Sequence, residues 1–283
     1  ALLGRIRGWN FTKSAIEAAM FQVLKKRGAV NLSDALHAPA IAAVPVGISL
    51  GIYQDPVEFY DVVQQAIASG YRRLKFKIAP FVDPKIFDYI NPLLFAQPTL
   101  HLGFDANGSF GAKHLDQLRY FVDTYHTAIE QPTPPNRFDL LLLAKQKHPR
   151  LEVCFDEEVK SIGDLVKLKS LNAIDELNLK IGRVGGISNS VQLLNYCYEQ
   201  ELACWIGGMF ETGVGRLLNL SMAAHLPQAK AHDLSPSSRY FEEDIVSPAV
   251  KMEDGQVSAH FVETCDVLPE ILDKYTTQRL KVF

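Results

Sequence analysis

Three carboxylates recur at almost equal spacing in the middle of the chain. Asp105 and Glu130 lie 25 residues apart, and Glu130 and Asp156 lie 26 apart. Each interval matches one strand plus one helix, so neighbouring parallel strands would bring the three side chains together. Carboxylate oxygens that leave room for water and substrate are ligands of hard divalent cations, and no histidine or cysteine occurs in register to favour zinc. The spacing therefore predicts a site for Mg²⁺ or Mn²⁺.

Three lysines stand where they could reach the same site. Lys75 and Lys77 are two residues apart in an apolar segment, so in a strand both would point to one face. Lys180 ends another apolar segment, just before a glycine-rich stretch in which the backbone can turn tightly. A proton next to a carboxylate is weakly acidic, and its removal leaves an enediolate that a divalent cation stabilises. Lysines on two sides of a substrate therefore indicate proton abstraction beside a carboxylate.

The segments that must position these residues alternate between short apolar and longer amphipathic stretches. After an opening helix at 12–26, this alternation predicts a parallel sheet with helices between the strands, for example at 56–69, 115–124, 162–170, 188–200 and 215–225. Eight strand-helix units favour a closed barrel over an open sheet. The expected strands are 44–50, 73–78, 100–105, 127–130, 152–156, 176–180, 202–206 and a weaker one at 229–233.

Polar residues or glycines stand at the end of every expected strand. A single one would usually form a turn. Eight in succession would meet at one mouth of a barrel, where the catalytic groups of this fold lie. These residues are Ser49, Lys77, Asp105, Glu130, Asp156, Lys180, Gly207 with Gly208, and Asp233.

Composition narrows the class of partner. The 283 residues are 47% hydrophobic and 22% charged, which permits a large core in one globular domain. The formal net charge of -3 argues against nucleic acid or an anionic membrane, and a small carboxylate substrate fits better. Apolar stretches are too short to span a bilayer and no signal sequence is visible, so we expect a cytoplasmic protein. The four cysteines form no CxxC pair and predict no disulfide framework.

Six motifs together resemble the enolase superfamily, specifically the muconate-lactonizing-enzyme subgroup and its o-succinylbenzoate synthase and N-acylamino acid racemase family. The resemblance covers nearly the whole chain and implies a (β/α)7β barrel. The motifs are K-x-K at 75–77, D-x-N-G at 105–108, I-E-Q-P at 129–132, D-E at 156–157, K-x-G-R-x-G-G at 180–186, and G-G-M-x-E-T-G-x-G-R at 207–216, with a further similar stretch at 233–245.

The resemblance implies a carbon-oxygen lyase of menaquinone biosynthesis. Lys77 would remove a proton from 2-succinyl-6-hydroxy-2,4-cyclohexadiene-1-carboxylate and Lys180 would stabilise the enediolate, giving o-succinylbenzoate. In the alternative activity, racemisation of N-succinylamino acids, both lysines would act as acid and base. The remaining assignments are substrate contacts at Ser49, Lys75, Asn107, Gly208 and Met209, and supporting roles for Glu157 and Asp233.

The resemblance also predicts how the chain is divided. We expect 1–40 to be a remnant of the capping domain with a linker helix, 41–250 the catalytic barrel, and 251–283 a segment that packs back on them. Most of the N-terminal α+β capping domain of the family is thus expected to be absent. An inert barrel that binds metal or carboxylates stays open as a non-enzyme alternative. A nucleotide-binding sheet is disfavoured because no G-x-G-x-x-G follows the first strand. A homo-oligomer is compatible with these predictions.

Overall fold

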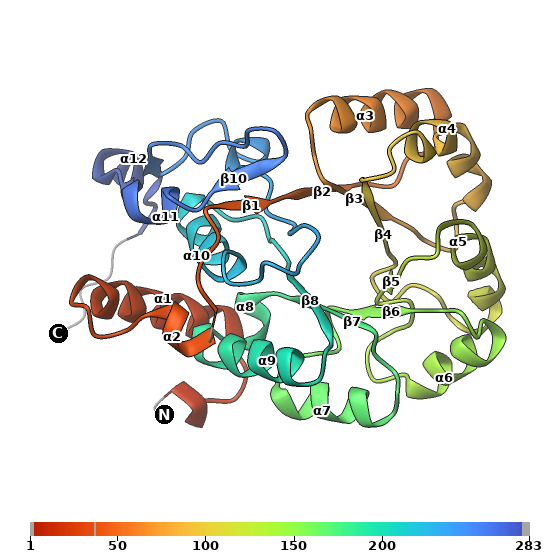
Figure 1. The fold of residues 1–283 in the computed structure, drawn as a ribbon, viewed down its shortest axis with the longest axis horizontal. Coiled ribbons are helices and arrows are strands. Elements are labelled where there is room, and N and C mark those ends of the chain that lie inside the picture. Colours follow the sequence, from red (N-terminus) through yellow and green to blue (C-terminus); the bar gives the residue numbers. More distant parts are fainter. Residues whose placement is uncertain (1–2, 37, 279–283) are drawn as a thin grey trace.

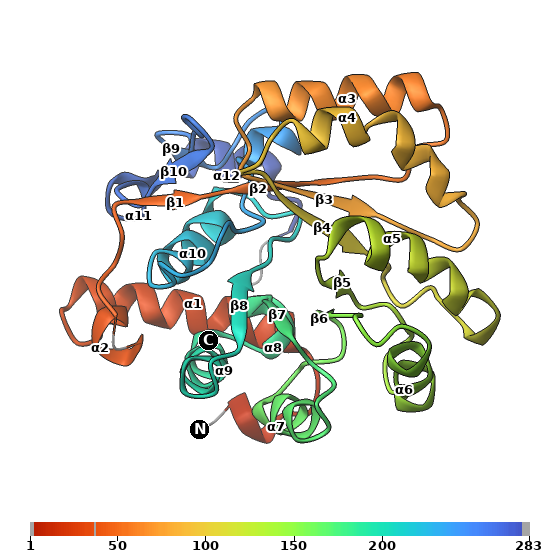
Figure 2. The same ribbon diagram turned by 45° about the vertical axis from the view of Figure 1, so that its right-hand side comes forward.

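The computed structural model describes residues 3–36 and 38–278. At its centre is a seven-stranded parallel sheet in which each strand lies beside the next one in sequence. The sheet curls, and helices lie along its outer side (Figures 1 and 2). The strands are β2 (Gly47–Leu50), β3 (Arg73–Lys77), β4 (His101–Asp105), β5 (Ile129–Glu130), β6 (Val153–Phe155), β7 (Glu176–Leu179) and β8 (Ala203–Ile206).

The helices between the strands begin where local sequence allows it. Asp55 accepts a hydrogen bond from the Val57 amide at 2.8 Å, and Pro56 occupies the first turn of its helix. The predicted helix at 115–124 is a 3-10 segment, Ala112–Gln117, followed by a shorter α-helix. The helices are α3 (Pro56–Ala68), α4 (Asn91–Phe95), α5 (Leu118–Tyr125), α6 (Phe138–Lys147), α7 (Ile162–Ser170), α8 (Ile181–Val184), α9 (Ile187–Glu199) and α10 (Gly213–Ala223).

Strand β3 shows how the alternation of residue types separates the core from the site. Leu74 and Phe76 are fully buried and belong to the hydrophobic core, where the Phe76 ring contacts that of Phe104. Arg73 and Lys75, which alternate with these two residues, lie over the Trp205 ring of β8, 3.8 and 5.2 Å from its centroid. Because successive side chains of a strand point to opposite faces, the basic residues line the inside of the curl.

The prediction of an eighth regular strand at 229–233 is wrong. Only a parallel bridge between His232 and Val46 is present, outside the named strands. The His232 carbonyl accepts a hydrogen bond from the Gly47 amide at 2.7 Å, and the Asp233 amide donates to the Ile206 carbonyl at 3.0 Å. Ala229 is instead part of a turn, since its amide bonds to Leu226. Two residues, rather than five, therefore connect β8 with the start of β2.

The first and last parts of the chain lie on the same side of the sheet (Figure 1). Helix α1 (Asn10–Lys26) packs against α8, and its Asn10 side chain donates to the Arg183 carbonyl at 2.7 Å. The predicted boundaries at 40 and 250 stay predictions. The other elements here are α2 (Leu32–Leu36), β1 (Ala43–Pro45) paired with β10 (Gln256–Ser258), β9 (Val246–Ser247) paired with β11 (Asp266–Val267), α11 (Phe261–Thr264) and α12 (Pro269–Tyr275).

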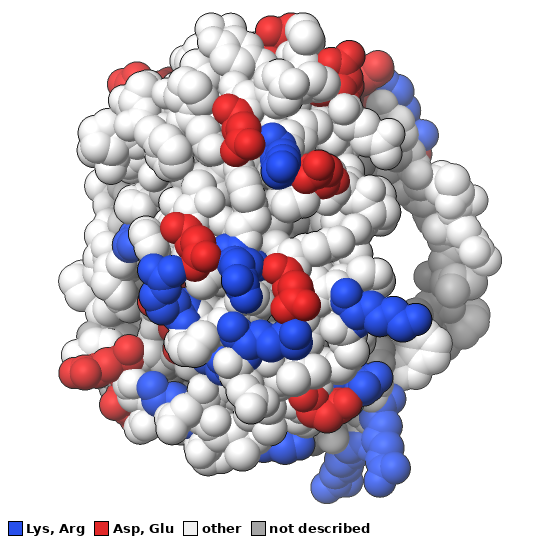
Figure 3. Space-filling view, turned by 90° about the vertical axis from the view of Figure 1, so that its right-hand side faces the viewer, with Lys and Arg blue, Asp and Glu red and all other residues white. Residues whose placement is uncertain are grey.

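One face of the molecule carries charges of both signs (Figure 3). On the face in Figure 3, acidic and basic side chains are interspersed and no broad area of one sign stands out. Within residues 3–36 and 38–278, no helix is both long and apolar enough to cross a bilayer.

Candidate active site

A cavity of about 470 Å³ lies at the carboxyl ends of the strands. Ten of the twelve predicted site residues line it. The other two, Glu130 and Asp156, are 1% exposed and contact lysines that line the cavity. The predicted residues in the lining are Ser49, Lys75, Lys77, Asp105, Asn107, Glu157, Lys180, Gly208, Met209 and Asp233.

Two lysines reach this cavity from distant parts of the sheet. Lys77 ends β3 and Lys180 directly follows β7, and strands β4, β5 and β6 lie between them. Those three strands carry the predicted carboxylates at or just after their ends. Asp105 and Glu130 are partners in the register of β4 and β5. The curl of the sheet thus places a row of carboxylates between two ammonium groups.

Lys75 is the most buried cation of the site. Its Nζ lies 3.0 Å from Glu130 Oε2, 3.2 Å from Asp233 Oδ2 and 3.7 Å from Asp105 Oδ2. Burial opposes the charge of Lys75, but these carboxylates raise its pKa, so it stays an ammonium. Burial raises the pKa of Glu130 and outweighs the attraction of Lys75. Lys75 therefore serves as an internal counter-ion of the carboxylates.

Lys77 is more accessible and is held by two partners. Its side chain is 35% exposed, and its Nζ donates to Asp105 Oδ2 at 2.8 Å and to the Asn107 side-chain oxygen. Asn107 has a φ of 42°, a left-handed conformation that asparagine tolerates, and its side-chain Nδ2 donates to Glu157 Oε1 at 3.0 Å. Burial opposes ionisation of Asp105, but the two neighbouring lysines lower its pKa. Lys77 is thus positioned by the last residue of β4 and by groups on the loops after β4 and β6.

Lys180 is held by Asp156 on the other side of the cavity. Its Nζ donates to Asp156 Oδ2 at 2.6 Å, and Arg183 Nε lies 2.9 Å from Asp156 Oδ1. Helix α8 begins immediately after Lys180 and ends at two glycines with φ of 93° and 127°. These left-handed values require glycine, as the sequence predicted for a tight turn. The turn returns the chain to α9 while Lys180 stays at the mouth.

Glycines after β8 allow the close approach of neighbouring side chains. A Cβ at Gly207 would lie 1.9 Å from Asn178 Oδ1 and 2.9 Å from Lys180 Cγ. A Cβ at Gly208 would lie 2.2 Å from the Asp233 carbonyl oxygen. Gly207 therefore keeps free the space that the Lys180 side chain occupies.

The donor set fits a hard divalent cation, although the carboxylates are paired with ammonium groups. Among the residues that the structure describes, no group of three or more His, Cys, Asp or Glu is arranged to hold a metal. Glu130 Oε2 and Asp156 Oδ1 are buried and accept no regular hydrogen bond within the described ranges, although Lys75 Nζ and Arg183 Nε lie 3.0 and 2.9 Å from them as ion-pair partners. Buried carboxylate oxygens that lack a regular hydrogen bond suit a metal that prefers oxygen ligands. The metal roles of Asp105, Glu130 and Asp156 stay predictions.

Six further residues line the cavity that were not predicted as site residues: Leu50, Gly51, Arg183, Phe210, Arg239 and Tyr240. Arg183, Phe210, Arg239 and Tyr240 stand inside the similar stretches at 180–186, 207–216 and 233–245, so their place near the site could have been found. Arg239 contacts Ser49 across 190 residues of chain. Nothing in the local pattern indicates a contact of that range.

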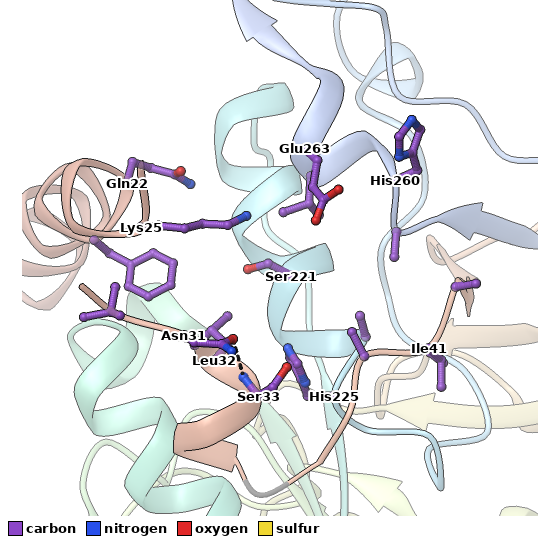
Figure 4. Close-up of a pocket in the computed structure, with 17 residues that line it drawn as sticks. Gln22, Lys25, Asn31, Leu32, Ser33, Ile41, Ser221, His225, His260 and Glu263 are labelled. Atoms are coloured by element: carbon purple, nitrogen blue, oxygen red, sulfur yellow. Dashed lines mark hydrogen bonds between the residues drawn. The ribbon is translucent and has the colours of Figure 1, made fainter. Parts of the chain in front are cut away.

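Two other cavities lie away from the predicted residues. Figure 4 shows one of about 310 Å³, lined by residues of α1, α10 and α11 among others, including Lys25, Ser221 and Glu263. The second, of about 450 Å³, lies at the amino ends of the strands, where Arg73 and Glu176 line it. Neither contains a predicted site residue, so the lysine-lined cavity is the candidate active site.

Comparisons with known proteins agree with this geometry. A model of the family "Enolase C-terminal domain-like" matches residues 58–261. The o-succinylbenzoate synthase of Enterococcus faecalis is 35% identical over 89% of this chain and 68% of its own length. That of Listeria innocua is 32% identical over 97% and 73%. The N-succinylamino acid racemase of Thermus thermophilus is 34% identical over 89% and 67%.

Solved structures have the same fold. An enolase superfamily member from Listeria innocua superposes with a TM-score of 0.87 at 30% identity, over 98% of this chain and 74% of that one. A muconate cycloisomerase from Pseudomonas fluorescens gives 0.82 at 21% identity, over 96% and 76%, which shows the fold alone. The chain belongs to the enolase superfamily, and within it to the family of the o-succinylbenzoate synthases and N-succinylamino acid racemases.

Proposed function

We propose that this chain is an o-succinylbenzoate synthase, which dehydrates 2-succinyl-6-hydroxy-2,4-cyclohexadiene-1-carboxylate. The observation that carries the proposal is that Lys77 and Lys180 face one cavity with a row of carboxylates between them. The similarity to o-succinylbenzoate synthases over most of the chain supports it. The reaction would belong to menaquinone biosynthesis, in the cytoplasm.

Lys77 is the acid and base of the proposed reaction. With its amine neutral, it removes the proton from the ring carbon beside the carboxylate. The electron pair of that C–H bond moves onto the substrate carboxylate and gives an enediolate. It then returns to form a ring double bond as the C–O bond of the neighbouring hydroxyl breaks. The Lys77 ammonium then returns the proton to the departing hydroxyl, which leaves as water from the same face of the ring. Asn107 and Asp105 hold the Lys77 nitrogen in place.

Lys180 stabilises negative charge on the opposite side of the substrate. Its ammonium, held by Asp156, faces the carboxylate oxygens on which charge develops as the proton leaves. A bound Mg²⁺ or Mn²⁺, held by Asp105, Glu130 and Asp156, would supply further stabilisation of that charge. Ser49, Gly208 and Met209 line the cavity where the side arm of the substrate would lie.

Racemisation of N-succinylamino acids is the second candidate. The same pair of lysines favours it, because one on each face of an α-carbon can remove and return a proton. The relative from Thermus thermophilus supports this reading. Both substrates carry a succinyl arm and an acidic carbon beside a carboxylate, so one site could accept both.

The test is turnover of the cyclohexadiene carboxylate, followed by loss of its absorbance, with Mg²⁺ and with EDTA. Racemisation of N-succinylphenylalanine is measured in parallel by polarimetry. Fast metal-dependent dehydration supports the synthase, and racemisation without dehydration supports the second candidate. Absence of both reactions would favour the inert carboxylate-binding barrel.

A further inference from the structure

The basic side chains of the cavity differ in whether a carboxylate neutralises them. Lys75, Lys77 and Lys180 each have a carboxylate oxygen within 3.0 Å. Arg183 has one at 2.9 Å. Arg239 also lines the cavity, but no ion pair of its guanidinium is present among the described residues. Arg239 is therefore the cation of this lining that has charge to offer to a ligand.

Neutral groups hold the Arg239 side chain. Its Nη2 donates to the Ser49 carbonyl at 2.6 Å, and its Nη1 donates to the Tyr240 hydroxyl at 3.3 Å. Its Cζ lies 5.4 Å from the centre of the Tyr240 ring. Neither partner carries a negative charge, and no hydrogen bond of its Nε is present in the described part of the chain. The guanidinium is thus oriented at the mouth with donors left over for an anion.

Two loops fix this position. Phe210, from the loop after β8, meets the Tyr240 ring edge-on at 5.0 Å. Asp244 links the loop after β8 to the segment that carries Arg239 and Tyr240. It accepts hydrogen bonds from the Gly213 amide at 2.8 Å and from the Ser237 hydroxyl. Phe210 is 81% exposed, so its apolar surface is available beside Arg239. Together these side chains form a wall with an apolar part and one cationic end.

We propose that Arg239 binds the carboxylate at the far end of the substrate's side arm and thereby selects dicarboxylates. This inference rests on the proposed function, in which the arm is a succinyl group. Phe210 and Tyr240 cover the methylene groups, while Lys77 acts on the carbon beside the other carboxylate and Lys180 stabilises the charge on that carboxylate. Bidentate pairing with carboxylate is what the planar guanidinium favours. Arg239 is a specificity residue that takes no part in proton transfer.

The experiment compares two ligands that differ only in the charge of the arm. The first is o-succinylbenzoate, and the second is 2-butanoylbenzoate, whose arm has the same length but ends in a methyl group. Their affinities are measured by calorimetry with Mg²⁺ present, for the wild type, Arg239→Gln and Arg239→Lys. Arg119→Gln removes an exposed arginine outside the cavity and serves as the matched control. Steady-state KM and kcat for the dehydration substrate are measured on the same proteins.

Arg239→Gln is expected to weaken binding of o-succinylbenzoate by about tenfold to hundredfold, the range of a hydrogen bond to a charged group. Binding of 2-butanoylbenzoate stays unchanged, which shows that the site is intact. KM rises while kcat stays within about threefold, and Arg239→Lys keeps part of the preference. Equal losses for both ligands, an unchanged preference, or no binding of o-succinylbenzoate by the wild type would overturn the inference.

The binding measurements separate this inference from the proposed function. If no variant or wild type turns over either substrate, yet Arg239→Gln loses only the charged ligand, the specificity role stands and the synthase proposal fails. If the wild type dehydrates its substrate and Arg239→Gln prefers o-succinylbenzoate over 2-butanoylbenzoate as strongly as the wild type does, the synthase proposal stands. Arg239 then has no role in specificity.

Discussion

Lys180 Nζ lies 2.6 Å from Asp156 Oδ2, so a lysine predicted to act on the substrate is held by a carboxylate predicted to bind metal. Lys77 and Asp105 repeat this relationship at 2.8 Å on the other side of the cavity. A cation that binds the carboxylates competes with the ammonium groups for the same oxygens. Metal binding would therefore change how firmly both lysines are held.

The first prediction concerns metal affinity. Asp156→Asn is expected to weaken Mg²⁺ binding at least about tenfold, because it removes the charge of a ligand. Isothermal titration with MgCl₂ measures the change directly, without substrate. Asp116→Asn, which removes an exposed carboxylate paired with Lys147, should leave Mg²⁺ affinity unchanged. Equal affinity of Asp156→Asn and wild type would remove Asp156 from the metal site.

A second prediction separates the two lysines. Lys77→Ala and Lys180→Ala should each lower racemisation of N-succinylphenylalanine by about 10²- to 10⁴-fold, the usual contribution of a positioned acid or base. In deuterated water, each variant should still exchange the α-proton of one enantiomer, and the two variants should differ in which one. Proton NMR of the separate enantiomers measures this. If both variants lose α-proton exchange for the same enantiomer, the two lysines do not lie on opposite faces of the substrate.

The third prediction follows from the space beside Gly207. Gly207→Ala puts a methyl group where Asn178 and the Lys180 side chain lie, so Lys180 must shift. Because a displacement of about 1 Å at a reacting group can cost about 100-fold in rate, kcat should fall by roughly that factor. Gly163→Ala is the control, since its nearest neighbour atom lies at 3.7 Å. Unchanged kcat in Gly207→Ala would show that this space is not needed.

The sequence predicted the strands that carry the site residues better than it predicted how the sheet closes at its eighth strand. Alternation in β3 and the spacing of Asp105 and Glu130 depend on local periodicity and on one strand-helix repeat, which the sequence displays. The family assignment is confirmed by the comparisons. The eighth strand failed because only His232 and Asp233 pair, while a turn occupies the start of the segment.

Other features depend on contacts between distant residues. The pairing of each carboxylate with a lysine is set by how the strands curl, which periodicity does not encode. The contact of Arg239 with Ser49 likewise joins segments 190 residues apart. These relationships need the packed structure, because no local preference distinguishes them from the many other pairs that could form.

The fourth prediction concerns Lys75 and stability. Lys75→Met would leave three carboxylates near each other without their internal cation. Removal of one partner of a buried ion pair typically costs about 3–5 kcal/mol, so the free energy of unfolding should fall by that amount. Urea denaturation followed by circular dichroism measures it. Lys147→Met, at an exposed pair, should change the free energy by less than about 1 kcal/mol. A similar small effect at Lys75 would refute its role as counter-ion.

The fifth prediction concerns pH. Burial, with a smaller contribution from Arg73, lowers the pKa of His232 to about 3 from 6.5. The unfolded chain therefore binds a proton that the folded chain does not, and stability falls as pH drops from 6.5 towards 3. This residue should account for about 1.6 kcal/mol between pH 6.5 and 5.

His232→Asn keeps an acceptor for the Ile206 amide and should flatten that pH dependence. Its overall stability can differ from that of the wild type, so the slope against pH is the informative quantity. His114→Asn, at an exposed position, is the control. Parallel slopes for wild type and His232→Asn would show that His232 titrates normally in the folded protein.

The most direct measurement of the central claim is the initial rate of dehydration of 2-succinyl-6-hydroxy-2,4-cyclohexadiene-1-carboxylate by wild type and Lys77→Ala, both with Mg²⁺. The wild type should convert the substrate to o-succinylbenzoate, and Lys77→Ala should be slower by at least about a hundredfold. Circular dichroism shows whether the variant is folded. A folded Lys77→Ala protein that dehydrates the substrate as fast as the wild type would contradict the claim that Lys77 transfers the proton.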